Sequence, residues 1–383
     1  MSELGRVVAA VGGVVLIVVI LSDAVATLIV TQGSSGLWRP ARLFYAATWR
    51  GVRSLSARLP DRAGEGVLNV YPALSLLGLL VLWLAGLLIG WSLVYWGIHQ
   101  HVTGTSDFGS IVYYAGTSLV TPVFGSAHGA VVRLLTLLET LTGIVTIALM
   151  ISYLPALYGA YSRREARLLT LDDPQGGRLT PVRVVAVHAP GGDLDMLYRS
   201  FADWEAWTAD VLESHVSYPM LALFRSQHPG QSWVTALGVL TDAATLTSAC
   251  VVGAKDREPY FLYRRGRRAV LEISSRIHVP ATGAHAPWLT EENFESAWRG
   301  LVELGLPLRD KAEAWVDLRA IRATYGDDLE RLIDFLVAPR GFWGHSAEAT
   351  VAEEVKAAAA EARRKVLTGR AVEGGGDAVT LRS

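Results

Sequence analysis

The sequence predicts an all-α integral membrane protein with three transmembrane helices, a short re-entrant helix between the second and third, and a mainly helical cytoplasmic domain. Charged side chains are very unevenly distributed, because residues 66–106 and 140–162 contain no Asp, Glu, Lys or Arg. A membrane helix needs ~20 mostly apolar residues to cross the hydrocarbon core. Three segments meet this requirement: residues 7–30, 71–98 and 131–161.

The composition of the whole chain limits the classes of function. Of its 383 residues 51% are hydrophobic and only 19% are charged, and the formal net charge is −1. This balance predicts membrane lipid as a partner and gives no electrostatic reason to expect nucleic acid. Cys250 is the only cysteine, which excludes an intrachain disulfide and a cysteine-based metal cluster within one chain.

The first apolar segment has some features of a secretory signal peptide. Its apolar run of about 24 residues is longer than a signal core, and it lacks a clear small-residue cleavage site. We therefore expect residues 1–36 to form a retained N-terminal transmembrane helix. Asp23 lies toward its cytoplasmic end and needs a partner or a wet location. We expect its side chain to snorkel to the interface.

The distribution of arginine indicates how the segments are oriented. Three arginines follow the third segment, whereas residues 99–132 contain no Lys or Arg. Because short cytoplasmic loops are enriched in Lys and Arg, we expect the N-terminus outside and the C-terminal domain in the cytoplasm. The protein would then be a multi-pass protein of the plasma (inner) membrane. The first loop is also rich in arginine, with Arg39, Arg42, Arg50, Arg53, Arg58 and Arg62.

Residues 37–66 are predicted to form an amphipathic interfacial helix rather than a plain linker. Apolar residues recur there at helical spacing, with arginines between them. Such a helix suits the membrane surface, with its apolar face down and its arginines near anionic headgroups. A helix packed on the cytoplasmic domain is the alternative.

The connection at residues 99–132 is too apolar for an ordinary loop and too short for two further crossings. Its residues 107–120 could form a helix of ~20 Å, which enters the membrane without leaving the other side. The backbone that returns from this helix must be buried in protein or line a wet cavity. Residues 67–165 are therefore predicted to form a pore domain of a span, a re-entrant helix with a return loop, and a second span.

These residues resemble a known family. Residues 113–121 (YYAGTSLVT) resemble the pore helix of two-span potassium channels, and residues 137–143 (LLETLTG) resemble the start of their inner helix. Residues 153–158 (YLPALY) and 162–165 (SRRE) resemble bacterial members with an extra N-terminal span and a helical cytoplasmic tail. The resemblance implies a homotetramer, because one chain supplies a single pore loop. It also implies K⁺ or another monovalent cation as the permeant ion, and no cofactor.

The segment that aligns with the family's selectivity filter departs from the pattern T-V-G-Y-G-D. In the family, filter carbonyls replace the hydration shell of the ion, and glycine lets the backbone visit left-handed conformations. Val123 stands in place of the first glycine, where a β-branched residue is disfavoured, and proline at 122 has a fixed φ. The resemblance therefore implies a pore but leaves the ion selectivity open. The pore and filter candidates are Thr121, Pro122, Val123, Phe124, Gly125 and Ser126.

Five further residues are candidates for sensing or gating. His99, His101 and His128 lie at the predicted outer mouth, where imidazoles could sense external pH or be ordinary solvated side chains. Gly143 and Pro155 lie in the third segment. They could bend a gating helix, or be a helix-packing glycine and a tolerated membrane proline.

The cytoplasmic part is predicted to be a helical domain at residues 166–345, followed by an Ala-rich helix and a disordered tail at residues 346–383. Residues 180–188 alternate briefly in hydrophobicity, which indicates a short strand. Residues 233–253 are apolar apart from Asp242. We interpret them as a buried core helix, with a fourth span as the alternative.

A basic patch lies in the same domain. It would suit anionic lipid or an acidic ligand, and a solvated face is the alternative. Five arginines surround three aromatic residues there: Arg257, Arg264, Arg265, Arg267 and Arg268, with Tyr260, Phe261 and Tyr263.

The sequence contains no phosphate-binding loop, zinc-protease motif or nucleophile elbow. We therefore expect no enzymatic activity, no catalytic residue and no metal site. The favoured hypothesis is a potassium-channel-like cation channel subunit with a cytoplasmic regulatory domain. The alternative is a non-conducting membrane scaffold or sensor that retains the channel architecture.

Overall fold

The computed structural model describes the chain as a helical protein of two compact units, residues 1–160 and 161–383. In the described part the only strand-like pairing is an isolated bridge between Val251 and Leu308. The predicted all-α fold class is therefore confirmed for the described part. The described residues are 3–29, 39–98, 107–121, 129–171, 179–226, 231–254, 257–281 and 288–340.

Three helices of the described part are long and apolar enough to cross a membrane, which agrees with the three predicted spans. They are Glu3–Leu28, Asp61–Gly97 and Ala130–Leu171. The first two are α1 and α3. The third comprises α5, Ala130–Leu168, and the short 3₁₀ helix η2, Leu169–Leu171.

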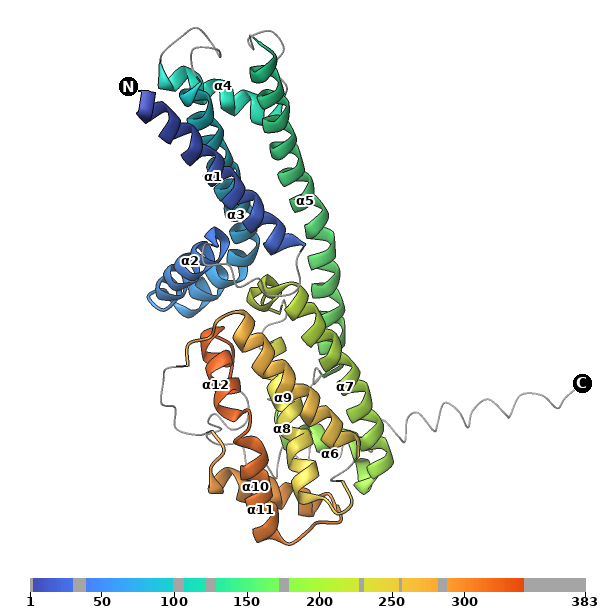
Figure 1. Ribbon diagram of the computed structural model, residues 1–383. Helices are drawn as coiled ribbons and strands as arrows, with labels where there is room; N and C mark the ends of the chain where they lie inside the picture. Colours follow the sequence, from blue (N-terminus) through green and yellow to red (C-terminus); the bar gives the residue numbers. More distant parts are fainter. Residues whose placement is uncertain are drawn as a thin grey trace, which may run out of the picture. The chain divides into compact units, whose positions relative to one another are not determined.

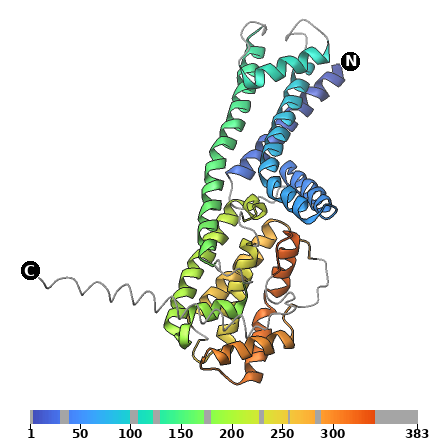
Figure 2. The same ribbon diagram turned by 180° about the vertical axis from the view of Figure 1, so that it is seen from behind.

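In the first unit α1 lies along α3, as Figures 1 and 2 show from two sides. Glycines permit a close approach, since a Cβ added to Gly13 would lie 2.4 Å from the carbonyl oxygen of Gly90. Small residues at such crossings are typical of packed membrane helices. The outer face of α1 carries apolar side chains such as Val7 and Val11, which are 60% and 58% exposed. An exposed apolar face of this kind suits lipid.

Asp23 is buried and paired, which corrects the expectation that its side chain snorkels to the interface. Its Oδ2 accepts hydrogen bonds from the backbone N–H of Ala41 at 2.8 Å and from Nε1 of Trp83 at 3.0 Å. The Nε atom of Arg39 lies 3.7 Å from Oδ1. Ala41 is in the first turn of α2, Pro40–Ser56, where backbone N–H groups lack helical partners and a negative charge is favourable. The Asp23 carboxylate therefore joins α1, α2 and α3.

The arginine-rich segment after α1 forms the helix α2, which ends at Ser56. From Asp61 onward the chain belongs to α3, which thus begins before the apolar stretch at 71–98. The hydroxyls of Thr48 and Tyr71 are 2.8 Å apart and join the two helices.

The second unit is built around α8, Trp233–Cys250, in which every residue except Thr235 is buried. This agrees with the interpretation of residues 233–253 as a core helix, and α8 is not among the three span-length apolar helices. Its Asp242 accepts hydrogen bonds from the Tyr325 hydroxyl at 2.6 Å and from Arg322 Nε at 3.2 Å. The other helices of this unit are α6 Pro181–His188, η3 Pro190–Gly192, α7 Leu194–Ser217, η4 Pro219–Leu223, α9 Glu258–Arg276, α10 Glu291–Glu303, α11 Lys311–Arg322 and α12 Gly326–Phe335.

The strand expected at residues 180–188 is wrong, because the segment forms the helix α6. The Thr180 side chain caps this helix by accepting from the N–H of Arg183 at 3.1 Å. Pro181 occupies the first turn, where its missing N–H costs nothing. The cap and the proline favour a helix more strongly than the alternating valines favour a strand. The residues from Pro181 to Ala186 are also all buried, so the segment lacks the polar face of a half-exposed strand.

Candidate functional site

The short helix predicted between the second and third spans is present as α4, Phe108–Val120. Its N-terminus is capped by Asp107, whose side chain accepts a hydrogen bond from the N–H of Ser110 at 2.9 Å. Thirteen residues span ~20 Å at 1.5 Å per residue, about two thirds of the hydrocarbon core. Helix α4 is therefore too short to cross a membrane by itself.

One face of α4 is held by hydroxyl and carboxylate groups. The Tyr114 hydroxyl and Thr136 Oγ1 are 2.7 Å apart. Because the Thr136 hydroxyl donates to the carbonyl of Val132, Tyr114 is the donor to Thr136. Tyr95 from α3 packs edge-on against Tyr114, with ring centroids 5.3 Å apart, and donates to Glu139 Oε2 at 2.8 Å. These groups join α3, α4 and α5 in a buried polar cluster.

The C-terminal end of α4 rests on α5. The Thr140 hydroxyl donates to the carbonyl oxygen of Ser118 at 2.6 Å. It also lies 3.0 Å from the carbonyl oxygen of Thr136, four residues earlier in α5. The usual helical donor to Ser118 would be the N–H of residue 122, which is proline and has no N–H. Thr140 therefore supplies a donor that the sequence of α4 itself cannot provide.

Gly143 of α5 lies against the last turn of α4. A Cβ added to Gly143 would lie 2.0 Å from the carbonyl oxygen of Leu119, a distance that no side chain tolerates. Of the two interpretations left open by the sequence, the helix-packing role of Gly143 therefore has structural support. A role in gating stays a prediction. Pro155 lies inside α5, which continues through it to Leu168.

The structure describes only the first of the six filter candidates. Thr121 ends α4: its N–H and its hydroxyl both reach the carbonyl of Thr117, each at 3.1 Å. Its backbone is extended, with φ −138° and ψ 134°. The other candidates lie outside the described residues: Pro122, Val123, Phe124, Gly125 and Ser126, together with the outer-mouth histidines His99, His101 and His128.

The electrostatics at the end of α4 favour a cation. The last carbonyls of a helix carry a partial negative charge of about half an electron. The α5 residues whose contacts with α4 are described above, Thr136, Thr140 and Gly143, carry no charge. Among the described residues no group of three or more His, Cys, Asp or Glu is placed to hold a metal ion. The C-terminal end of α4 therefore carries a partial negative charge.

Sequence reasoning predicted no contact around α4 for Tyr95, Thr136, Glu139 or Thr140, although Glu139 and Thr140 lie in the segment 137–143 that carries the resemblance. A signal for the α5 residues was present, because Thr136, Glu139, Thr140 and Gly143 recur at helical spacing in an otherwise apolar segment. Such a stripe marks one face of a helix that contacts a polar partner. No comparable pattern distinguishes Tyr95 from any other aromatic residue near the end of a span.

The last turns of α5 are held inside the second unit through Arg164. This guanidinium group is fully buried and donates to the carbonyls of Phe224 at 2.7 Å and Leu221 at 3.2 Å. It pairs with Glu165 at 2.7 Å. Because α5 is one continuous helix from Ala130 to Leu168, its two ends belong to different units.

His215 of α7 lies directly against this guanidinium group. Its Nδ1 is 2.7 Å from the carbonyl of Val211, and its Nε2 is 3.2 Å from Arg164 Nη1. The ring is therefore neutral, with a proton on Nδ1 and a lone pair on Nε2 facing Arg164. Burial and the neighbouring positive charge of Arg164 lower the pKa of His215 well below its usual value.

No family model, curated protein or solved structure matches this chain.

Proposed function

We propose that the chain is one subunit of a potassium-channel-like cation channel in the plasma (inner) membrane, with the second unit as its cytoplasmic regulatory domain. The observation that carries this proposal is the fixation of α4. A helix too short to cross a membrane is held between two span-length helices by Tyr95, Thr136 and Thr140. This is the arrangement that a re-entrant pore helix requires.

In this proposal α4 enters the membrane from outside and the chain returns through residues 121–129. Backbone that is not helical is tolerated at membrane depth only where it is buried or lines a wet cavity. The anchored C-terminus of α4 would point its carbonyls toward that cavity and stabilise a cation there. Thr140 and Gly143 would then position the start of the return segment.

One chain supplies one such segment, so a pore needs several copies, and the resemblance implies four. The exposed face of α5 supports an assembly, because its apolar side chains lack cover within one chain. Leu134, Leu137, Leu141 and Ile144 are 50–59% exposed. Lipid or the helices of neighbouring subunits would cover them.

The second unit would act on the pore through α5. Since Arg164 fixes the last turns of α5 inside this unit, a conformational change there would pull directly on the helix that carries Thr140 and Gly143. The orientation expected from the arginines places this unit in the cytoplasm.

A non-conducting scaffold with the same architecture is the second candidate, and Val123 is the observation that favours it. A β-branched residue disfavours the left-handed backbone that a carbonyl filter uses. Such a protein would keep α4 and its anchors for assembly alone, and would work through the second unit.

Cation flux into liposomes that contain the purified protein tests the proposal, with K⁺ compared with Na⁺ and the wild type compared with a Val123→Gly variant. Flux in the wild type supports a channel, and a preference for K⁺ would mean that the altered filter still coordinates this ion. Flux in the Val123→Gly variant but not in the wild type supports the second candidate, a non-conducting scaffold that retains the channel architecture. Absence of cation flux in both the wild type and the variant, with the protein shown to be folded and tetrameric, overturns the proposal.

A further inference from the structure

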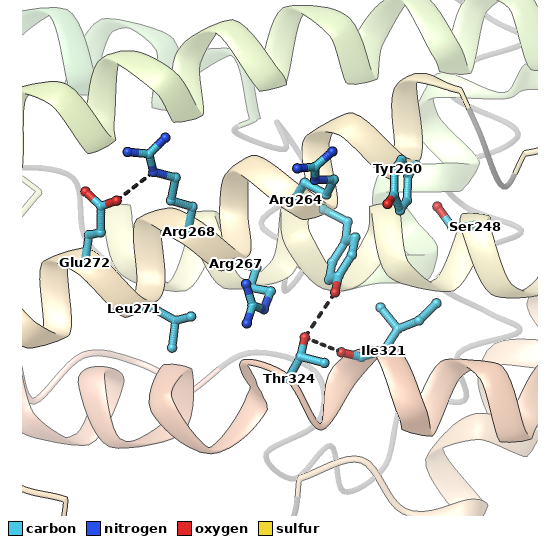
Figure 3. A pocket seen from close by; sticks show the side chains of 10 residues that line it. Ser248, Tyr260, Arg264, Arg267, Arg268, Leu271, Glu272, Ile321 and Thr324 are labelled. Atoms are coloured by element: carbon cyan, nitrogen blue, oxygen red, sulfur yellow. Dashed lines mark hydrogen bonds and ion pairs between the residues drawn. The ribbon is translucent and has the colours of Figure 1, made fainter.

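The second unit contains an open groove of about 560 Å³ between α9 and α11, with Ser248 of α8 at its floor. Figure 3 shows the arginines of α9 that line it: the guanidinium group of Arg267 lies toward Ile321 and Thr324, and those of Arg264 and Arg268 lie on the other side of the helix. The volume lies within the ~300–1,000 Å³ of small-molecule sites. The groove lies entirely within the second unit, so ligand binding there does not depend on whether the chain conducts ions.

The basic patch seen in the sequence is divided by the structure, and only part of it lines the groove. Arg265 points elsewhere and pairs with Glu205 at 3.0 Å. Arg257 lies over the ring of Tyr198, with its guanidinium carbon 5.7 Å from the centroid. The groove is lined by Arg264, Arg267 and Arg268, of which Arg264 and Arg268 are four residues apart and lie on the same side of α9.

Only one of these three arginines is paired with a carboxylate of the described residues. Arg268 pairs with Glu272 at 2.6 Å, whereas Arg264 and Arg267 have no carboxylate within 4 Å in the described part of the chain. Arg264 instead lies over the ring of Tyr260, with its guanidinium carbon 5.8 Å from the centroid. With three guanidinium groups and one carboxylate, the groove carries two net positive charges.

The floor of the groove contains a polar atom that lacks a partner. Ser248 is only 3% exposed, and its Oγ has no hydrogen-bond partner among the described residues. A buried hydroxyl without a partner destabilises the folded state. Neighbouring threonines of α8 avoid this cost, since Thr245 and Thr247 donate to carbonyls four residues earlier. The Ser248 hydroxyl is therefore open to an oxygen atom of a ligand.

We propose that this groove binds a small phosphomonoester. The phosphate contacts Arg267, because guanidinium groups bind phosphate oxygens through paired, charge-assisted hydrogen bonds. A phosphomonoester carries about −1.5 to −2 charges at pH 7, which matches the two net positive charges of the groove. Ser248 bonds a ligand oxygen at the floor, and Tyr260 and Tyr263 contact the organic part. The ligand is either a soluble phosphorylated metabolite or the headgroup of a phosphomonoester lipid.

Calorimetric titration of the full-length protein in detergent tests this assignment. The probes are AMP, glycerol 3-phosphate and dihexanoyl phosphatidic acid, and glycerol serves as the uncharged control. We expect at least one phosphate probe to bind with a Kd below ~1 mM and glycerol not to bind. Preference for AMP or glycerol 3-phosphate indicates a soluble ligand, and preference for the short-chain lipid indicates a headgroup. If none of the three probes binds at a concentration of about 10 mM, which would detect even millimolar affinities, the proposal is overturned.

Matched variants locate the binding site. Arg267→Gln removes one unpaired guanidinium from the groove and should weaken phosphate binding at least ~10-fold, because hydrogen bonds between charged groups contribute about 1.5–3 kcal/mol. Arg265→Gln removes the same charge from the same helix outside the groove and should change the affinity less than ~3-fold. Equal losses in both variants would mean general attraction by the basic helix and would overturn the proposal.

Ser248→Ala supplies a second, independent readout. Because the Ser248 hydroxyl has no partner in the described structure, its removal should leave thermal stability unchanged or raise it. Phosphate binding should weaken several-fold in the same variant. A loss of stability without a loss of affinity would mean that the hydroxyl has a structural partner, and would remove it from the proposed site.

Discussion

The hydroxyl of Thr140 in α5 donates to the carbonyl of Ser118 in the last turn of α4 over 2.6 Å. Residue 122 is proline and cannot donate to this carbonyl from the backbone. The contact therefore supplies a hydrogen-bond donor to a carbonyl group that has none from the backbone of α4. It also makes the position of α4 depend on two small features of α5, the Thr140 hydroxyl and the bare backbone of Gly143.

A Gly143→Ala substitution should displace α4. The added Cβ would lie 2.0 Å from the carbonyl oxygen of Leu119, and a backbone carbonyl can move away only if the helix moves. We expect a loss of about 1–3 kcal/mol in stability, as in other overpacked sites. A lower thermal midpoint in detergent and a lower cation flux would both report this loss.

Gly116→Ala is the matched control, since it places the same methyl group in α4 itself. The added Cβ would meet only Leu88 Cδ1 at 3.6 Å, an ordinary contact. This variant should keep both the thermal midpoint and the flux of the wild type. If Gly143→Ala behaved like Gly116→Ala, the close approach of α4 and α5 described here would be wrong.

Much of this architecture was predictable because the signals were local. The three spans follow from apolar length, and α4 follows from a short apolar segment capped by Asp107. The partners of α4 were not predictable, because Tyr95 and Glu139 are 44 residues apart and no local pattern relates them. Asp23 was misjudged for the same reason. Its partners Ala41 and Trp83 lie 18 and 60 residues away.

The error at residues 180–188 has a different cause. A few alternating valines indicate a strand only when one face is polar, and this segment is buried on all sides except at its end. The stronger local signal was the pair Thr180-Pro181, which starts a helix.

An Asp23→Asn variant should be less stable than the wild type. The amide oxygen can take the place of Oδ2 and accept from Ala41 and Trp83, but the negative charge is lost and the N–H₂ group then faces Arg39 in place of Oδ1. Hydrogen bonds to a charged group contribute about 1.5–3 kcal/mol, so a loss of this order is expected. Tryptophan fluorescence during thermal unfolding in detergent measures it.

Asp61→Asn provides the comparison for Asp23→Asn, because Asp61 also lies in the first unit but is exposed. This substitution should change stability by less than ~0.5 kcal/mol, as is usual for surface positions. Equal stability of the two variants would show that the buried Asp23 carboxylate does not hold α2.

Stability should fall with pH below neutrality because of His215. The folded state holds this ring neutral with a lowered pKa, whereas the unfolded state takes up a proton at about pH 6.5. Stability is therefore fully present above about pH 6.5 and is lost as the pH falls below it. One such group contributes a loss of about 1.4 kcal/mol at pH 5.5.

A His215→Gln variant should lose less stability than the wild type between pH 7.5 and 5.5. Some dependence should remain, because burial also lowers the pKa of His188. Urea unfolding of the variant and the wild type at several pH values would measure the difference. If the slope in His215→Gln matched that of the wild type, His215 would not be the group that titrates.

The channel function is tested most directly by the rates of K⁺ and Na⁺ movement into liposomes that hold the wild-type protein, shown beforehand to be folded and tetrameric. We predict cation flux well above that of protein-free liposomes, and a lower flux with Gly143→Ala than with Gly116→Ala. Liposomes as tight as the protein-free ones would contradict the channel function, whatever the stability of α4.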